Sequence, residues 1–337
     1  MTDPRAPSTS VSPGRPINLV FLGCGLITGF HSRWLARHRR DVHCFYASRD
    51  MAKARACHQH YHGGGFFDGY DTALCDPRIE VAVVATPPST HLDLTLRALQ
   101  AGKNVIVEKP AFLTSSDFDV IRRVQAETGR RVFVAENYFY KPLTMRLREI
   151  VASGMLGEIL FVYINAMKYQ RTENWRDDAR LAGGGALFEG GVHWINLLAN
   201  LGLTINSVHG MRVGPPQALE RTMLVGVRYA EGAAGLLAHS WETPAPFRVL
   251  RLSKIYGRQG SVTFESNGLM VLVNSRRKRL IFPSLTDVTG HRAMWQDFIY
   301  CLRSGAEPRM TLQLAQRDLA LIEAVYRSAD QPLPMSR

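Results

Sequence analysis

A short apolar run that leads into closely spaced glycines constrains the fold of this chain more than any other feature. Residues 17–22 are apolar apart from one asparagine, and Gly23, Gly25 and Gly29 follow at the start of a stretch with helical character. A strand, a glycine turn and a helix in this order can bind a pyrophosphate, because the turn admits the anion and the helix points its first amides at it. Thr28 stands where Gly or Ala is usual. The turn therefore predicts a dinucleotide site.

The alternation of apolar runs and helical stretches continues to about residue 135. The runs are bounded by glycine, proline or charged residues, as buried parallel strands tend to be. They lie at Ile17–Leu22, Val42–Ala47, Val81–Ala85, Asn104–Val107 and Val132–Ala135. Strands that alternate with helices predict a Rossmann-type, doubly wound parallel sheet. We assign this α/β domain to residues 17–137 and expect a disordered tail at residues 1–16.

The pattern changes after Tyr138, where a helix at residues 143–153 is followed mostly by β-like segments. Their close spacing predicts antiparallel pairing. The segments lie at residues 159–168, 205–213, 222–229, 233–240, 249–255, 261–265 and 269–273, with helices expected near 290–303 and 312–328. We predict an α+β domain with a large, mainly antiparallel sheet at residues 138–337. A sheet with one uncovered face favours self-association, so we expect a homodimer or homotetramer.

Composition narrows the class of protein. The net charge of +12 could indicate nucleic acid or an anionic cofactor, or a bias toward solubility, but the basic residues are scattered. The one dense run, Arg276–Arg279, lies between two β-like segments and fits a solvated hairpin turn, so we expect no nucleic-acid partner. The sequence contains no run of eighteen apolar residues and its N-terminus has no signal-peptide pattern, which predicts no membrane association and a cytoplasmic location. Five irregularly spaced cysteines predict free thiols and no metal site.

The end of the second strand bears on the choice of dinucleotide. An acidic residue at this place would bind the ribose hydroxyls of NAD. Here the strand ends in Ser48 and Arg49, with no carboxylate before Asp50. A hydroxyl beside a guanidinium suits a 2′-phosphate, so we predict NADP(H), with NAD(H) as the alternative. Arg49 as a solvated surface residue is the other interpretation.

Three further stretches bear groups suited to chemistry. Residues 86–91 and 108–111 follow the third and fourth strands, where open sheets bind ligands, and residues 183–196 combine glycines with Glu189 and His193. Together these stretches resemble the glucose–fructose oxidoreductase and inositol dehydrogenase family, often called Gfo/Idh/MocA. The similarity runs from about residue 17 to 329 and includes residues 137–142 and the pair Trp175 and Arg176.

The resemblance implies an NAD(P)-dependent oxidoreductase. Such an enzyme transfers a hydride between the nicotinamide and a carbinol or ketone carbon of a sugar, cyclitol or related polyhydroxylated compound. In the resemblance Lys109 matches the lysine that contacts the nicotinamide ribose and the substrate hydroxyl, and His193 matches the acid/base. Glu189 and Asn196 stand where aspartates are common.

The residues agree with these roles. Glu189 and His193 are four apart, so on a helix they share a face and the carboxylate can orient the imidazole. Lys109 at a strand end can stabilise an alkoxide. We expect cofactor contacts from Gly23, Gly25, Leu26, Ile27, Ser48, Arg49, Thr86, Pro87, His91, Glu108 and Lys109. We expect substrate contacts from Lys109, Tyr140, Trp175, Arg176 and His193, with Lys109, His193 and Glu189 as the catalytic set.

Other interpretations stay open at this point. In one of them Lys109 binds only cofactor phosphate and His193 is a core histidine with satisfied hydrogen bonds. In others the protein reduces a non-sugar carbonyl or an imine, or is a dinucleotide-binding sensor without catalysis.

Overall fold

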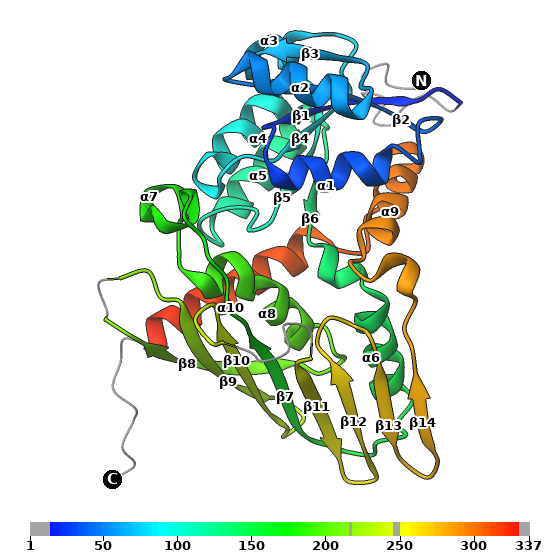
Figure 1. Ribbon diagram of the computed structural model, residues 1–337, viewed down its shortest axis with the longest axis vertical. Coiled ribbons are helices and arrows are strands. Elements are labelled where there is room, and N and C mark those ends of the chain that lie inside the picture. Colours follow the sequence, from blue (N-terminus) through cyan, green and yellow to red (C-terminus); the bar gives the residue numbers. More distant parts are fainter. Residues whose placement is uncertain (1–13, 216–217, 245–249, 330–337) are drawn as a thin grey trace, which may run out of the picture. The chain divides into compact units, whose positions relative to one another are not determined.

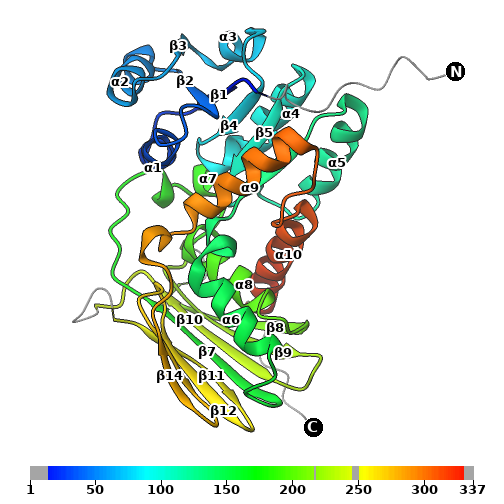
Figure 2. The same ribbon diagram turned by 90° about the vertical axis from the view of Figure 1, so that its right-hand side faces the viewer.

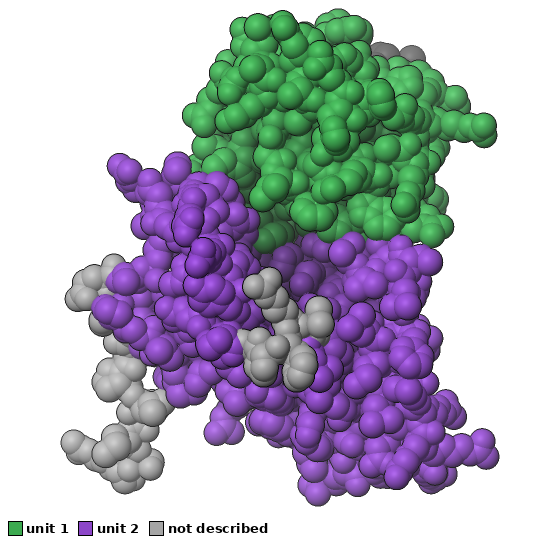
Figure 3. All heavy atoms as spheres, in the orientation of Figure 1, with its two compact units in different colours: residues 1–135, 291–316 green, residues 136–290, 317–337 purple. Residues whose placement is uncertain are grey.

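The computed structural model describes residues 14–215, 218–244 and 250–329, so most of the expected N-terminal tail lies outside the described residues. The chain divides into two compact units, coloured separately in Figure 3. Unit 1 comprises residues 1–135 and 291–316, and unit 2 comprises residues 136–290 and 317–337. The expected second domain, residues 138–337, therefore differs from unit 2, because residues 291–316 belong to unit 1.

Unit 1 is built on a six-stranded parallel sheet with the strand order β3-β2-β1-β4-β5-β6. The strands are β1 (Ile17–Leu22), β2 (Val42–Ser48), β3 (Gly65–Asp68), β4 (Val81–Val84), β5 (Asn104–Glu108) and β6 (Val132–Ala135). The chain reverses direction across the sheet between β1 and β4, which are paired neighbours. This confirms the doubly wound sheet, and ligands of such folds bind beside this reversal.

The helices of unit 1 cover the sheet (Figures 1 and 2), which is why β4 is apolar at every position. They are α1 (Leu26–Leu35), α2 (Met51–Tyr61), α3 (Tyr70–Cys75), α4 (His91–Gln100), α5 (Asp117–Thr128) and α9 (His291–Ser304). The last of these joins unit 1 through its apolar face. Phe298 packs against Phe133 of β6, and Trp295 donates a hydrogen bond to His31 of α1. These contacts join residues far apart in the sequence, so no local pattern predicts them. This explains the difference in domain bounds.

Unit 2 is built on an eight-stranded sheet with the order β14-β13-β12-β11-β7-β10-β9-β8. The strands are β7 (Ile159–Met167), β8 (Ile205–Val213), β9 (Thr222–Tyr229), β10 (Ala234–Ser240), β11 (Leu252–Gly257), β12 (Gly260–Glu265), β13 (Val271–Asn274) and β14 (Lys278–Ile281). Only β7 and β10 pair in parallel within this sheet. The mainly antiparallel sheet is confirmed.

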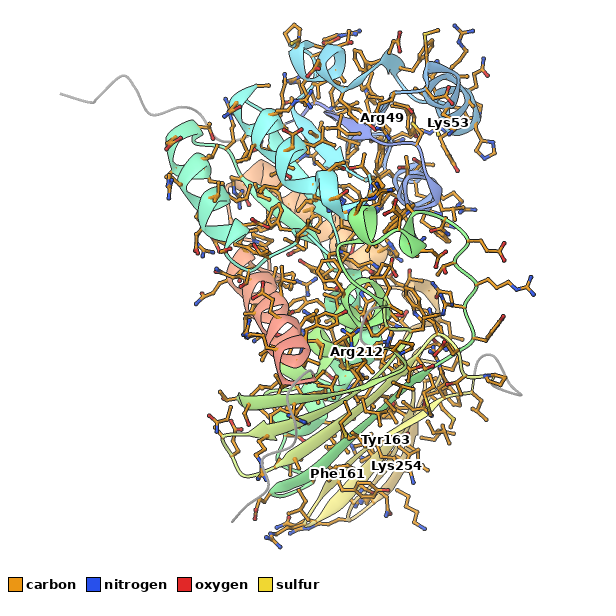
Figure 4. The ribbon with its side chains drawn as sticks, turned by 90° about the vertical axis from the view of Figure 1, so that its left-hand side faces the viewer. Arg49, Lys53, Phe161, Tyr163, Arg212 and Lys254 are labelled. Atoms are coloured by element: carbon orange, nitrogen blue, oxygen red, sulfur yellow. The ribbon has the colours of Figure 1, made fainter. Side chains whose placement is uncertain are left out.

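The helices of unit 2 lie on one side of this sheet (Figures 1 and 2). They include α6 (Pro142–Ala152), α7 (Ala179–Ala182) and α8 (Val192–Ala199), and α10 (Leu312–Ala329) contributes its residues from 317 onward. Along β7 the residues alternate between buried and partly exposed, and Phe161 and Tyr163 lie on the partly exposed face with Lys254 of β11 (Figure 4). None of the helices in the described part of the chain is long and apolar enough to cross a membrane.

Candidate functional site

The glycine turn between β1 and α1 has the geometry of an anion site. Gly23 has a φ of +109°, and a Cβ on it would lie 2.6 Å from the carbonyl oxygen of Ala85, so only glycine fits. A Cβ on Gly25 would meet no atom within 4 Å. Helix α1 starts at Leu26 with no side-chain cap and no acidic residue in its first turn, which leaves its first amides available to an anion.

Thr28 has a structural role in this turn. Its side chain is fully buried, and its hydroxyl donates a 2.7 Å hydrogen bond to the carbonyl oxygen of Gly23. The departure from the usual glycine or alanine therefore adds a bond that holds the turn. The Thr28 hydroxyl, buried where the helix packs on the strand, thus has a hydrogen-bond acceptor.

Two cations, Arg49 and Lys53, follow the end of β2, and the ammonium of Lys53 lies 3.7 Å from the carboxylate of Asp50. Ser48 is nearly buried and accepts a hydrogen bond from the amide of Asp50, whose own carboxylate caps α2 by accepting from Ala52. Arg49 is exposed and lies near Lys53 (Figure 4), and its charge opposes the rise that burial causes in the pKa of Tyr70. The sequence analysis missed Lys53. The sequence feature that could have identified Lys53 is its position as a second cation, four residues after Arg49 and at the start of a helix.

Glu108, at the end of β5, holds the residue that follows it. Its Oε1 lies 2.5 Å from His31 Nε2, and its Oε2 accepts from the amide of Lys109 at 3.1 Å. The indole of Trp295 donates to His31 Nδ1, so that nitrogen carries no proton and Nε2–H donates to Glu108. Burial raises the pKa of Glu108, but the hydrogen bond from His31 and the charge of Lys109 outweigh it and lower the pKa. The carboxylate of Glu108 thus positions Lys109, and its contact with the cofactor stays a prediction.

His91 joins the two loops at the ends of β4 and β5. It is 1% exposed, with Nε2 2.8 Å from the carbonyl oxygen of Thr86 and Nδ1 2.9 Å from that of Pro110. Burial lowers the pKa of His91, and these carbonyls oppose the shift. His91 therefore supports the loops that carry Thr86, Pro87 and Lys109, and its direct contact with the cofactor stays a prediction.

His193 lies in the first turn of α8 in unit 2, and a carboxylate from a distant segment orients it. Its Nδ1 is 2.6 Å from Oε1 of Glu136, which is 2% exposed and directly follows β6. The imidazole stacks on Tyr138 with ring centroids 4.0 Å apart and 11° between the planes. Glu136 also accepts from the amide of Tyr138, so the pair and the stacked ring form one rigid group. A carboxylate on Nδ1 fixes the tautomer and directs Nε2 to a ligand.

The orienting role predicted for Glu189 is therefore corrected, since the partner of Nδ1 is Glu136. Residues Leu187–Gly191 form a π-helix, so the regular helical spacing assumed between Glu189 and His193 does not apply. The carboxylate of Glu189 accepts a 3.0 Å hydrogen bond from Nη2 of Arg176. The same guanidinium lies over the ring of Trp175, so unit 2 brings these three predicted residues together.

Tyr138 replaces Tyr140 as the tyrosine next to the histidine. Tyr140 is 1% exposed and packs edge-on against Phe139. The hydroxyl of Tyr138 makes no hydrogen bond with the described residues, and burial raises its pKa to about 12. Lys141 lies 4.0 Å from the Tyr138 ring centroid, and burial lowers the pKa of this lysine to about 8. Sequence reasoning missed Glu136 and Tyr138, although both stand directly after a predicted strand.

Asn196 belongs to the packing of α8 against α10. It is fully buried, and its Nδ2 donates a 2.6 Å hydrogen bond to Oδ2 of Asp318. Burial raises the pKa of Asp318 to about 6. An aspartate at position 196 would place two carboxylates together in the core, so the amide suits this chain better than the acid common at that place.

Comparisons with known proteins agree with this architecture. Residues 17–136 match the family model described as "Oxidoreductase family, NAD-binding Rossmann fold", and residues 144–263 match the "GFO/IDH/MocA C-terminal domain". The chain is 25% identical over 308 residues to the uncharacterized oxidoreductase ORF334 of Rhizobium meliloti, covering 85% of this chain and 88% of that protein. It is 23% identical over 290 residues to D-xylose 1-dehydrogenase (NADP(+)) 2 of Haloferax volcanii, covering 84% and 88%.

A solved structure shares the whole fold. The aldose-aldose oxidoreductase of Caulobacter crescentus, complexed with glycerol, superimposes with a TM-score of 0.83 at 21% identity, covering 94% of this chain and 98% of that one. The two family models together span most of the described chain, one on each side of the junction near Glu136. The chain therefore belongs to the Gfo/Idh/MocA family of NAD(P)-binding oxidoreductases.

Proposed function

We propose that this protein is an NADP(H)-dependent dehydrogenase or reductase that acts on a carbinol or ketone carbon of a sugar, cyclitol or related polyhydroxylated compound. The observation that carries the proposal is the buried pair of Glu136 and His193, stacked on Tyr138. A histidine in the core for packing alone would not need a carboxylate at 2.6 Å and a stacked tyrosine whose hydroxyl has no partner among the described residues. The name of the D-xylose 1-dehydrogenase relative supports a sugar substrate.

His193 moves the proton in this proposal. During oxidation its Nε2 takes the proton of the substrate hydroxyl, and Glu136 stabilises the imidazolium that forms. During reduction the same nitrogen returns the proton. Stacking on Tyr138 holds the plane of the ring, so the nitrogen keeps its direction through the reaction. The nicotinamide of a bound dinucleotide accepts or supplies the hydride.

Lys109 stabilises negative charge on the substrate oxygen. Glu108 holds its backbone amide, and His31 and Trp295 in turn hold Glu108. This buried chain of hydrogen bonds fixes the segment that carries the ammonium group, as a preorganised site requires.

The preference for NADP(H) rests on the end of β2. Arg49 and Lys53 supply two cations and Ser48 supplies a hydroxyl, while the carboxylate of Asp50 caps α2 and lies 3.7 Å from the Lys53 ammonium. A 2′-phosphate would gain charge-assisted hydrogen bonds there. The NADP(+) in the name of the xylose dehydrogenase relative points the same way.

The test combines binding and turnover. NADPH binding is followed by fluorescence, and turnover is measured against a panel of aldoses and polyols that includes D-xylose. Replacing His193 by Ala should lower turnover by roughly 10²–10⁴ and leave NADPH affinity nearly unchanged. Replacing Lys109 by Ala should lower both. Full activity of the His193→Ala variant would overturn the acid/base assignment, and NADPH binding without turnover on the whole panel would favour a dinucleotide sensor.

We further propose that the uncovered face of the unit 2 sheet joins two copies of the chain. Phe161, Tyr163 and Lys254 lie on this face (Figure 4), and Tyr256 and Leu272 add exposed apolar surface. Apolar residues gathered on one exposed sheet face favour burial against a copy. Sedimentation at micromolar concentration should show a dimer or tetramer that the Tyr163→Glu variant weakens. A monomeric protein would refute the proposal.

A further inference from the structure

The helical segment that leads to His193 has no cap of its own. It begins after Gly183–Gly185, and its π-helix, Leu187–Gly191, continues directly into α8. The first amides of a helix lack acceptors within that helix. Here the amide of Glu189 donates to the carbonyl oxygen of Gly185 at 3.1 Å, so the amides of residues 185–188 need acceptors from elsewhere. Glycines offer no side chain that could supply them.

Glu220, two residues before β9, supplies two of these acceptors. It is 4% exposed, its Oε1 accepts from the amide of Leu187, and its carbonyl oxygen accepts from the amide of Ala186, both at 2.8 Å. A Cβ on Gly185 would lie 1.8 Å from Oε2 of Glu220, and the φ of this glycine is not in the left-handed region. Gly185 is therefore required for space and not for its conformation. It makes room for a carboxylate that also suits the positive end of a helix.

Tyr326 of α10 binds the remaining two amides. Its hydroxyl oxygen accepts from the amides of Gly185 and Phe188, both at 3.3 Å, and donates to Oε1 of Glu220 at 2.8 Å. One donated and two accepted bonds use the full capacity of a hydroxyl. The guanidinium of Arg212 (Figure 4) lies 6.0 Å from the centroid of the Tyr326 ring. Burial raises the pKa of Glu220, and the charge of Arg212 opposes the rise.

Helix α10 contacts the same segment again on the other side of His193. Asp318 accepts the 2.6 Å hydrogen bond from Asn196 of α8. Asp318 and Tyr326 are eight residues apart on α10, about two turns of one helix. His193 stands between the two contacts in the sequence. Glu136 and the stacked Tyr138 hold its ring, whereas α10 holds the backbone on both sides of it.

We propose that Tyr326 and Glu220 are positioning residues for the acid/base His193. The inference rests on the proposed function and deepens it. Neither residue moves a proton to or from the substrate. They fix the start of the segment that carries His193, so that its imidazole meets Glu136 and its Nε2 keeps its place. Proton transfer needs hydrogen-bond reach, and a small displacement lowers the rate more than it lowers binding.

The test compares two buried tyrosine hydroxyls that both bind this helical segment. Tyr326→Phe removes the hydroxyl that binds its start. Tyr229→Phe, the matched control, removes a hydroxyl that donates to the carbonyl oxygen of Leu198, in the last turn of α8. Rates are measured with NADP⁺ and the aldose or polyol that the wild-type protein oxidises fastest. We expect Tyr326→Phe to lower kcat roughly three- to tenfold with the KM for NADP⁺ unchanged. Tyr229→Phe should leave kcat unchanged although both variants lose a similar amount of thermal stability.

A second readout needs no turnover. In protein labelled with ¹³C-histidine, the stacked Tyr138 ring shifts the His193 signal through its ring current, so this signal reports the position of the imidazole. The His193→Ala variant assigns it. We expect Tyr326→Phe to move the signal and Tyr229→Phe to leave it in place.

The outcomes separate the positioning role from the reaction. If no compound of the panel reacts but only Tyr326→Phe moves the His193 signal, the positioning role stands and the proposed reaction fails. If the wild-type protein is active and Tyr326→Phe leaves kcat unchanged, the positioning role is refuted while the reaction stands. A His193 signal that stays in place in Tyr326→Phe, or equal losses of kcat in the two variants, would also refute it.

Discussion

The candidate sites of the two units are built from different parts of the chain. In unit 1 the anion site is made mostly of backbone from one contiguous segment, the turn from Gly23 to Leu26. In unit 2 the acid/base group is made of side chains from segments far apart in the chain, with Glu136 after β6 and His193 on α8. A site made of backbone depends on space and conformation, whereas a site made of side chains depends on a few particular atoms. Substitutions should therefore affect the two units differently.

The largest effect should come from filling the space at the glycine turn. Gly25→Val places a side chain where a pyrophosphate must approach, but its Cβ would meet no protein atom within 4 Å, so the fold should survive. We expect NADPH affinity to fall by about two orders of magnitude or more, as for loss of several phosphate hydrogen bonds. Fluorescence titration and thermal unfolding measure the two quantities.

The neighbouring glycine supplies the contrast. Gly23→Ala puts a Cβ 2.6 Å from the Ala85 carbonyl at a φ of +109°, so this variant should lose stability, by about 1–3 kcal/mol from backbone strain alone. A Gly25→Val protein that stays folded and binds NADPH like the wild type would contradict a site made of backbone.

The next effect concerns the carboxylate partner of the histidine. Glu136→Gln keeps the shape of the side chain and removes the charge that stabilises the imidazolium during oxidation. We expect turnover to fall by roughly 10- to 100-fold with NADPH affinity unchanged. The matched variant Glu189→Gln, which breaks the pair with Arg176, should cost less. Steady-state kinetics over a range of pH measures which variant loses more turnover. A larger loss in Glu189→Gln would show that Glu189, and not Glu136, orients His193.

A smaller effect should follow from changing the cations at the end of β2. Arg49→Gln and Lys53→Gln should each weaken NADPH binding about tenfold, because each removes one charge-assisted partner of the 2′-phosphate. NADH affinity should stay the same, which makes it the internal control. A wild-type protein that binds NADH more tightly than NADPH would show that these cations serve another purpose.

The smallest effect concerns a thiol next to the glycine turn. The neighbouring thiol of Cys24 lowers the pKa of Cys57 to about 7, whereas burial raises that of Cys44 to about 12. Because the thiolate is the reactive form, alkylation of Cys57 by iodoacetamide should rise with pH through a midpoint near 7 and level off above it. Mass spectrometry locates the modified residue. Cys44 should stay unmodified over this range, and Cys24→Ser should shift the Cys57 midpoint.

Local patterns predicted a large part of unit 1. Its apolar strands, its turn at Gly23 and Gly25, and its helices ending at glycines depend on residues close in sequence. The sequence alone therefore predicts them. The short strand β3 was missed, because Gly65–Asp68 has no run of apolar residues long enough to stand out. The role of Glu108 was also missed, since its partner His31 and the Trp295 that binds His31 come from segments far from it in the sequence.

Side-chain roles in unit 2 were harder to predict for a physical reason. The spacing of Glu189 and His193 suggested a pair, but a π-helix changes the geometry of that segment and Glu136 takes the place on Nδ1. Tyr140 and Tyr138 differ by two residues in sequence, yet one is fully buried and the other stacks on the histidine. Such choices depend on where the chain turns after β6, which no local pattern specifies.

By itself the sequence determined the class of both sheets, the dinucleotide turn and the presence of a histidine in a glycine-rich segment, because periodicity and turn chemistry act over a few residues. Only the tertiary structure decided which carboxylate orients His193 and why Asn196 suits its position beside Asp318. These outcomes depend on pairing and burial between segments tens of residues apart. Hydrogen bonds and desolvation act at contact distance, and only the folded chain brings those segments into contact.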